Sequence, residues 1–176
     1  MSRIFGAPRQ IGYVVDDLDG AIDRWVRLGV GPFFRIDGLK SKVFRVRGED
    51  VELNLNVAVA VSGDMQIELI HQTDDTPTPY RDFLLRHGPG LQHLAVWSDD
   101  YDAHTQRLRD AGFTSIIEGE VAIDEANAVR YSYYEPGFEG ATMMEIVDAS
   151  PFFVAMNDMI RQTSLDWDGS DPVRRI

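Results

Sequence analysis

The chain has 176 residues, 44% of them hydrophobic, which is enough for one compact domain or for two half-size modules that share a core. Its 29 acidic residues against 17 Lys and Arg give a net charge of −12, which argues against a nucleic-acid or anionic-membrane surface. The chain has no cysteine, which excludes disulfides and thiolate metal sites. It also has no apolar core of a signal peptide and no apolar run of about 18 residues, so we expect a cytoplasmic protein.

The first predicted unit is a strand followed by a helix. Residues 11–15 form an apolar run typical of a buried strand, and Asp16 and Asp17 follow as N-cap candidates. Apolar residues then recur at helical spacing until Gly29, a residue typical of the position that ends a helix. Strands rather than another helix are predicted next, at 33–36, 42–46, 52–61 and 65–70.

The second half repeats this order after a short helix at 79–87. Residues 94–97 predict a strand, Asp99 or Asp100 caps a helix, and Gly112 ends it. We expect the polar stretch 119–128 to be a mobile loop. The remaining strands are predicted at 115–118, 129–134 and 141–147.

Two stretches of each half match residue by residue, and this internal repeat predicts a duplicated module. QIGYVVDDLD aligns with HLAVWSDDYD, which places Gln10 opposite His93. MQIELI aligns with TMMEIV, which places Glu68 opposite Glu145.

The duplication predicts an α+β fold in which two βαβββ modules pair edge to edge. Residues 1–150 are expected to form one domain, built from a module at 8–75 and a module at 90–148, with the strands arranged as a half-open, curved, mixed β-barrel. Residues 151–176 add a C-terminal helix and tail.

The terminal helix begins at Ser150-Pro151 and carries five large apolar residues, too many to leave in water. It is expected either to cover the mouth of the barrel or to contact a second subunit, and we predict a homodimer. The polar tail from Asp166 has a composition that favours disorder.

Equivalent points of two paired modules converge, and Gln10, Glu68, His93 and Glu145 are such points. A carboxylate between apolar neighbours on a central strand is costly without a partner, and a divalent cation supplies one. For either glutamate alone, the simpler interpretation is a position on the solvent face of an alternating strand. For His93 alone, the simpler interpretation is a buried core histidine. The repeated register favours a metal site instead.

Other polar candidates are given no role in this site. Gln92 is expected to face away from His93, and we expect His71, His87 and His104 to be solvated.

These features resemble the vicinal oxygen chelate superfamily, which includes glyoxalase I, methylmalonyl-CoA epimerase, extradiol dioxygenases and bleomycin-resistance proteins. The resemblance covers residues 10–148 and is strongest to the epimerase branch, whose Gly-Leu-His-His motif stands here as Gly90-Leu91-Gln92-His93. Epimerases of this branch begin with His where this chain has Gln10. The set Gln, Glu, His and Glu is similar to that of glyoxalase I enzymes.

The resemblance implies an isomerase or lyase that removes a proton next to a metal-chelated carbonyl of a small-molecule substrate. It implies that Gln10, Glu68, His93 and Glu145 hold one divalent ion, which the donor set allows to be Zn, Ni, Co, Mn, Mg or Fe. Glu145 and Glu68 are then the candidate bases.

Two other functions stay open: a metal-free binding protein, as in the drug-sequestering relatives, and, less favoured, an iron dioxygenase. Iron dioxygenases use two histidines and one carboxylate, whereas this site offers one histidine. Glu52 lies near the position of a catalytic glutamate in epimerases, but we expect it to be a surface residue.

Two further groups bear on the substrate. A basic run could grip the carboxylates of glutathione or the phosphates of coenzyme A, although an exposed face of an edge strand is the simpler interpretation. A set of aromatic strand residues suggests an apolar or ring-bearing substrate, although such residues are more often core. The basic run is Arg35, Lys40, Lys42, Arg45 and Arg47, and the aromatic set is Tyr13, Phe33, Phe34, Trp97, Tyr131 and Tyr133.

Overall fold

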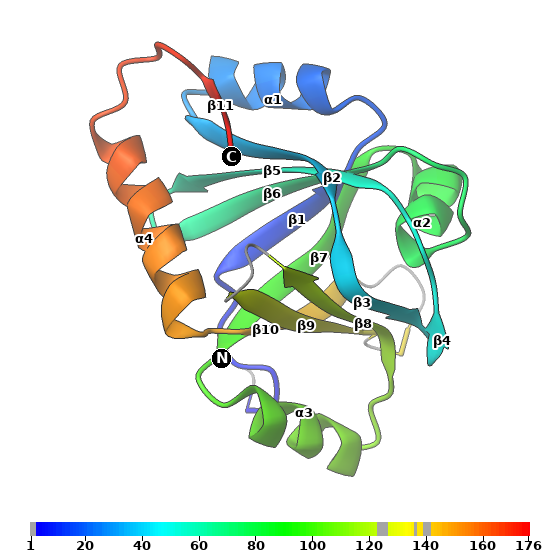
Figure 1. Cartoon of the computed structure of the whole chain (residues 1–176). Coiled ribbons are helices and arrows are strands. Elements are labelled where there is room, and N and C mark those ends of the chain that lie inside the picture. The colour runs from blue at the N-terminus through cyan, green and yellow to red at the C-terminus, as the bar shows by residue number, and fades with distance from the viewer. Residues whose placement is uncertain (1–2, 123–126, 136, 139–141) are drawn as a thin grey trace.

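A computed structural model describes residues 3–122, 127–135, 137–138 and 142–176. Its strands form one mixed sheet that curves around the centre of the molecule without closing (Figure 1). The helices are α1 (Leu18–Arg27), α2 (Pro79–His87), α3 (Tyr101–Asp110) and α4 (Pro151–Leu165). The strands are β1 (Gln10–Val14), β2 (Phe33–Leu39), β3 (Ser41–Val46), β4 (Glu49–Asp50), β5 (Leu55–Ser62), β6 (Met65–Gln72), β7 (Gly90–Ser98), β8 (Ser115–Ala122), β9 (Ala128–Tyr134), β10 (Met143–Asp148) and β11 (Val173–Arg175).

The strand order is β11-β2-β5-β6-β1-β7-β10-β9-β8-β3-β4, and the two modules meet where β1 pairs antiparallel with β7. Each module places its last strand parallel to its first, β6 beside β1 and β10 beside β7. The register is also shared: Glu68 lies opposite Gly12, and Glu145 lies opposite Ala95. Each glutamate therefore pairs two positions beyond Gln10 or His93, so the predicted α+β fold and its duplication are confirmed.

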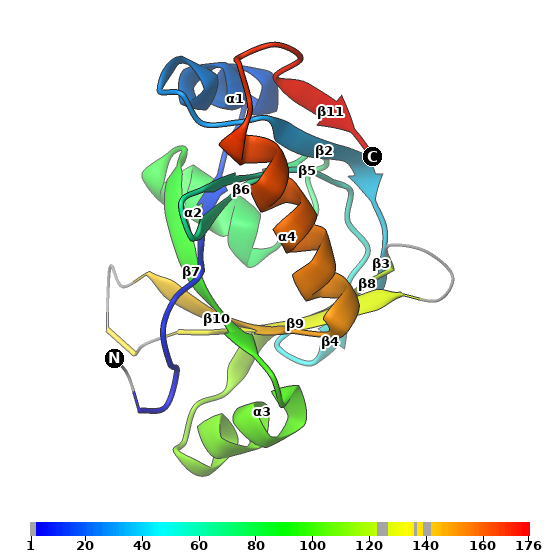
Figure 2. The ribbon, with the colours of Figure 1, turned by 90° about the vertical axis from the view of Figure 1, so that its left-hand side faces the viewer.

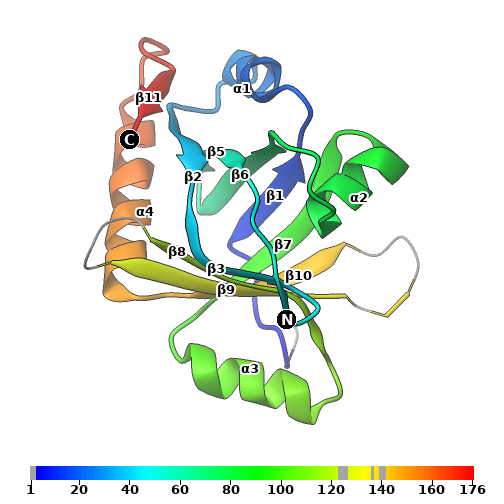
Figure 3. The ribbon, with the colours of Figure 1, turned by 45° about the vertical axis from the view of Figure 1, so that its right-hand side comes forward.

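The turn between β2 and β3 explains why the sheet curves into a half-open barrel. These strands are separated by Lys40 alone, yet β2 pairs with β5 of the first module and β3 pairs with β8 of the second. A chain that passes from one flank of the sheet to the other within one residue requires the sheet to curve until its flanks approach each other (Figure 3).

The helices α1 and α3 lie on opposite outer sides of this curved sheet (Figure 3). The carboxylate of Asp17 accepts a hydrogen bond from the Gly20 N–H at 3.0 Å, and Asp100 accepts one from the Ala103 N–H at 3.0 Å. These two residues are thus the N-caps, and each satisfies a free donor of a first helical turn.

The C-terminal helix α4 lies across one end of the curved sheet (Figure 2) and packs on β5. It buries Phe153, Asn157 and Ile160. It therefore covers the mouth, one of its two expected roles, and the homodimer stays a prediction. No helix among the described residues is long and apolar enough to cross a membrane.

Two expected irregular segments are ordered instead. The tail expected to be disordered from Asp166 adds β11 parallel to β2, and the Trp167 ring packs where a Cβ on Gly31 would lie 2.7 Å away. The expected loop 119–128 is wrong over its first four residues, because β8 continues to Ala122 in register with β9. Its residues 123–126 lie outside the described chain. Backbone pairing overrides polar composition in both places.

His104 is another correction, because it is buried rather than solvated. Its Nδ1 lies 3.1 Å from Ser98 Oγ and its Nε2 lies 2.8 Å from the Ile4 carbonyl oxygen. Burial lowers its pKa, so the neutral ring joins α3 to the N-terminal segment. By contrast, His87 is exposed and His71 is partly buried.

Candidate metal centre

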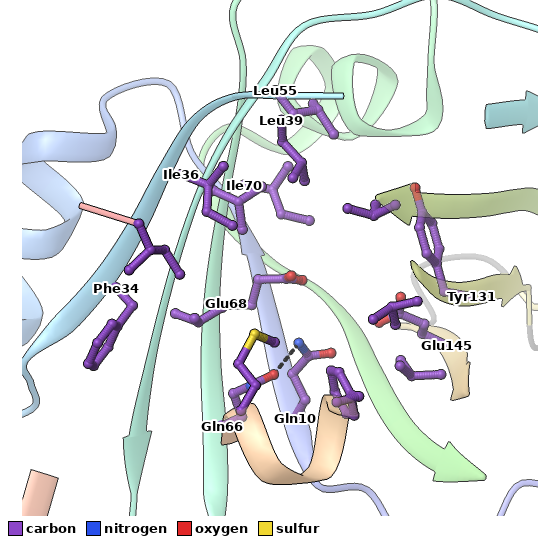
Figure 4. Close-up of a pocket in the computed structure, with 18 of the residues that line it drawn as sticks. Gln10, Phe34, Ile36, Leu39, Leu55, Gln66, Glu68, Ile70, Tyr131 and Glu145 are labelled. Atoms are coloured by element: carbon purple, nitrogen blue, oxygen red, sulfur yellow. Dashed lines mark hydrogen bonds between the residues drawn. The ribbon is translucent and has the colours of Figure 1, made fainter. Parts of the chain in front are cut away.

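The four predicted ligands come from four adjacent strands at the middle of the sheet: β1, β6, β7 and β10. Gln10, His93 and Glu145 are buried, with exposed fractions of 4%, 0% and 5%, and Glu68 is partly buried. The shared register brings these side chains to the concave side of the sheet, where three of them line one cavity (Figure 4).

Three of the side chains converge on one point. His93 Nε2 lies 3.3 Å from an oxygen of Glu68 and 3.3 Å from an oxygen of Glu145. One donor atom from each of the three residues lies within 4.8 Å of the others. Within the described chain, His93 Nε2 and Glu145 Oε2 are buried without a hydrogen-bond partner.

Gln10 supplies a fourth candidate ligand atom, its amide oxygen. Its Nε2 donates to Gln66 Oε1 at 2.6 Å, which leaves the Gln10 amide oxygen free. That oxygen is buried and has no hydrogen-bond partner among the described residues. Figure 4 shows the Gln10 amide, bonded to Gln66, in the same cavity as the carboxylates of Glu68 and Glu145.

A divalent cation fits this arrangement. Imidazole nitrogen and carboxylate oxygen bind such ions at about 2.0–2.2 Å, which sets neighbouring donors about 3.0–3.4 Å apart. The two measured separations of 3.3 Å lie in that range. A cation would also satisfy three buried atoms that are otherwise orphaned, each at a cost of about 1–3 kcal/mol.

Without a cation, the cluster retains a proton. Burial opposes the charge on His93, but the two nearby carboxylates of Glu145 and Glu68, each with an oxygen 3.3 Å from Nε2, outweigh it and raise the His93 pKa to about 9. Burial also raises the pKa of Glu145, more than His93 lowers it. A proton on Nε2 therefore occupies the place that a metal ion would take.

The expectation that Gln92 faces away from His93 is wrong, because the two side chains are in contact. In the pairing of β1 with β7, Gly12 lies opposite His93 and Tyr13 lies opposite Leu91, so Gln92 is the extra residue of a β-bulge. The bulge brings Gln92 Oε1 to 2.9 Å from His93 Nδ1. Because an amide oxygen only accepts, Nδ1 carries a hydrogen, which leaves Nε2 as the nitrogen that faces the glutamates and can bind a metal ion.

Gly12 is a site residue that sequence reasoning missed. A Cβ at this position would lie 1.8 Å from Cε1 and 2.0 Å from Nε2 of His93. The ring of a fully buried His93 thus occupies the space that any other residue would fill. A glycine inside a strand, opposite the candidate ligand, was the available signal.

Two tyrosines support the cluster: Tyr133, which belongs to the aromatic set named from the sequence, and Tyr80, which the sequence did not single out. The Tyr133 ring meets the His93 ring edge to face at 4.9 Å, and the Tyr80 ring packs on Tyr133 at 6.0 Å. A hydrogen bond from Tyr133 also favours the charged form of Glu145. Burial raises the pKa of both phenols, which therefore stay neutral.

The basic run does not line the cavity. Arg35 is buried rather than exposed and pairs with Asp19 and Asp37. Outside the cavity, Lys42 lies 3.8 Å from Glu120, Arg45 2.8 Å from Asp50 and Arg47 4.0 Å from Glu135. Lys40 and Glu52 are exposed and do not line it either.

The aromatic set divides between cavity and core. Phe34, Tyr131 and Tyr133 line the cavity. Tyr13 and Phe33 belong to the core beneath α1, and Trp97 packs edge to face against Phe153 of α4.

Comparison with known proteins identifies the family to which the chain belongs. The model of the glyoxalase/bleomycin resistance protein/dioxygenase superfamily matches residues 9–133. Among curated proteins, the chain is 25% identical over 134 residues to 4-hydroxyphenylpyruvate dioxygenase of Pseudomonas aeruginosa. That match covers 75% of this chain and 36% of the relative, so the chain spans about a third of the relative's length.

Solved structures of methylmalonyl-CoA epimerases share the fold. The Mycobacterium tuberculosis enzyme matches with a TM-score of 0.58 and 24% identity, over 88% of this chain and 95% of that one. A Streptomyces coelicolor epimerase variant in complex with 2-nitronate-propionyl-CoA matches with a TM-score of 0.54 and 18% identity, over 83% of this chain and 99% of that one.

Proposed function

Because the chain belongs to the glyoxalase/bleomycin resistance protein/dioxygenase superfamily, we propose that it is a divalent-metal-dependent isomerase or lyase acting on a small carbonyl compound. The observation that carries the proposal is the convergence of Glu68, His93 and Glu145 beside the free amide oxygen of Gln10. These four residues would hold the ion at the wall of a cavity large enough for a small molecule.

Each residue has a distinct part in this chemistry. A bound divalent ion would acidify the C–H bond next to a carbonyl that it chelates. Glu145 and Glu68 line the cavity from the two modules, so Glu145 would take up that proton and Glu68 could return one. Gln92 holds the His93 ring in the tautomer that a ligand needs.

Two alternative functions each have one observation in their favour. A protonated His93 between two carboxylates satisfies the site without metal, which favours a binding protein if no ion binds. The dioxygenase relative favours iron chemistry, but His93 is the single histidine that joins the cluster among the described residues.

The proposed function is tested by metal analysis combined with proton exchange. Purified protein is dialysed against Zn²⁺, Co²⁺, Ni²⁺ and Mn²⁺, and bound metal is counted by mass spectrometry. The loaded protein is then incubated in D₂O with 2-oxo and 2-hydroxy carbonyl compounds, and loss of the proton next to the carbonyl is followed by NMR. A folded protein that binds none of these ions would overturn the proposal.

Metal binding is expected to release a proton and to strengthen with pH. The cation needs the Nε2 lone pair, whereas in the metal-free protein His93 holds a proton up to a pKa of about 9. Below that pH the apparent affinity should rise by up to about tenfold per pH unit, and above it the dependence should flatten. Calorimetry at pH 7 in buffers of different ionisation enthalpy measures the released proton. An affinity that is constant from pH 6 to 8 would contradict this assignment.

A chain of amides links the metal centre to α4. Gln10 Nε2 donates to Gln66 Oε1, and Gln66 Nε2 donates to Asn157 Oδ1 at 3.1 Å. All three side chains are buried, with exposed fractions of 4%, 2% and 3%. Asn157 therefore orients Gln66, which in turn fixes the orientation of the Gln10 amide.

Asn157→Leu is expected to weaken metal binding about 10- to 100-fold, the usual effect of removing a partner of a metal ligand. The substitution removes the acceptor for Gln66 and lets both glutamine amides rotate. Asn157→Asp keeps an acceptor oxygen and should restore part of the affinity. Ile160→Val, also buried on α4, controls for altered helix packing and should bind metal normally. Wild-type affinity in Asn157→Leu would remove this positioning role.

A further inference from the structure

The cavity beside the proposed metal centre has one polar end and an apolar body. Gln10, Gln66, Glu68 and Glu145 are the non-aromatic polar residues among those described that line it. Figure 4 shows Leu39 and Leu55 at the end of the cavity away from Gln10 and Gln66. Any molecule that reaches the four polar residues therefore places the rest of its body against hydrocarbon.

Two helices add further side chains to the lining of the cavity. Phe153 and Met156 of α4 and Tyr80 of α2 contribute to the lining. Aliphatic side chains from both modules, such as Val57 and Val129, complete it.

No described residue that lines the cavity is Lys, Arg or His. The basic side chains that could supply a cation, such as Arg35 and Arg45, are paired with acidic residues outside it. A carboxylate or phosphate in this cavity would lose its hydration without gaining a partner. It would also approach Glu68 and Glu145, whose two charges already balance a divalent ion.

The open volume limits the size of the apolar group. The cavity measures about 120 Å³. A protein cavity of about 150 Å³ lined by Leu, Ile and Phe binds benzene. A ring of six atoms or a branched chain of similar size therefore matches the enclosed part of this cavity.

We propose that the substrate is an uncharged carbonyl compound that carries a compact apolar substituent beside its two chelating oxygens. This substituent, aromatic or branched aliphatic, occupies the space between Leu39, Val57 and Tyr131. The proposal rests on the proposed metal-dependent function and excludes a substrate with a carboxylate next to the reacting carbon.

Hydroxamic acids test this substrate class because they chelate a divalent ion through two neighbouring oxygens. The protein is loaded with Zn²⁺, the bound metal is counted, and three chelators are titrated by calorimetry. These are acetohydroxamic acid, benzohydroxamic acid and succinic acid monohydroxamate. We expect benzohydroxamic acid to bind at least about tenfold more tightly than acetohydroxamic acid, through burial of its ring. The succinic compound should bind more weakly than acetohydroxamic acid.

A matched pair of variants locates the preference in the cavity. Leu39 is partly buried in the lining, so Leu39→Arg introduces a cation there with access to solvent. This substitution should weaken the binding of benzohydroxamic acid and strengthen the binding of succinic acid monohydroxamate. Leu85→Arg, at a position 72% exposed on α2, should leave both affinities unchanged.

The outcomes separate the two proposals. If the protein binds no Zn²⁺, the proposed function fails and the substrate class fails with it. If it binds Zn²⁺ but favours the succinic compound, or does not distinguish the three chelators, the substrate class alone is overturned.

Discussion

Replacing Glu145 by Gln is expected to reduce the affinity for a divalent cation by at least about 100-fold. Loss of a partner that merely orients a ligand costs about 10- to 100-fold, and this change removes a charged ligand itself. The amide keeps the size of the side chain but loses the negative charge that faces His93 at 3.3 Å. Calorimetric titration with Zn²⁺ and Co²⁺ measures the difference.

In the same variant, the rate of proton exchange should also fall, by about 10²- to 10⁴-fold, because the candidate base is lost together with the metal ligand. Glu52→Gln is the matched control, since Glu52 is exposed and does not line the cavity. In the wild type and in this control, metal at 100 times its Kd should stabilise the fold by about 2.7 kcal/mol, read as a higher Tm. Metal stabilisation of equal size in Glu145→Gln at the same metal concentration would exclude Glu145 as a ligand.

Gly12→Ala is expected to have the second large effect, although Gly12 carries no functional group. Its new Cβ would lie 1.8 Å from the His93 ring, which is fully buried and held between Gln92 and Tyr133. Overpacking of this kind costs about 1–3 kcal/mol of folding free energy. The displaced ring also removes Nε2 from the metal, so affinity for Zn²⁺ should fall together with stability.

The control for this change is Gly90→Ala, in β7 itself. A Cβ there would meet Phe83 at 3.8 Å, an ordinary contact, so stability and metal affinity should stay close to wild type. Denaturant unfolding and Zn²⁺ titration on both variants measure the two quantities. If Gly12→Ala retains both wild-type values, the close approach of Gly12 and His93 is not what fixes the ring.

Much of the fold follows from periodicity and repetition in the sequence. The alignment of Gln10 with His93 and of Glu68 with Glu145 predicted duplicated modules, and the strand pairing repeats in register between them. Helix caps at Asp17 and Asp100 follow from local chemistry, because an Asp that accepts first-turn N–H groups needs no distant partner.

The support around the site was not predictable, because it depends on contacts distant in sequence. Asn157 reaches Gln66 across 91 residues, and no local pattern marks the pair. Gln92 was misassigned because simple strand alternation places it on the opposite face from His93, and the bulge that cancels this alternation depends on pairing with β1.

Two other misassignments have a common cause in tertiary pairing. Arg35 was expected on an exposed face, but β11 covers the outer side of β2, and the arginine forms ion pairs with Asp19 and Asp37. His104 was expected in solvent because its partner, the Ile4 carbonyl, lies 100 residues away.

The central claim, that Gln10, Glu68, His93 and Glu145 hold one divalent cation, is tested most directly by anomalous diffraction from crystals grown with saturating Zn²⁺ and measured on both sides of the zinc absorption edge. We predict one strong anomalous peak on the concave side of the sheet, in bonding contact with His93 Nε2 and with carboxylate oxygens of Glu68 and Glu145, and with the Gln10 amide oxygen turned toward it. A map without a peak among these side chains at saturating zinc would contradict the account.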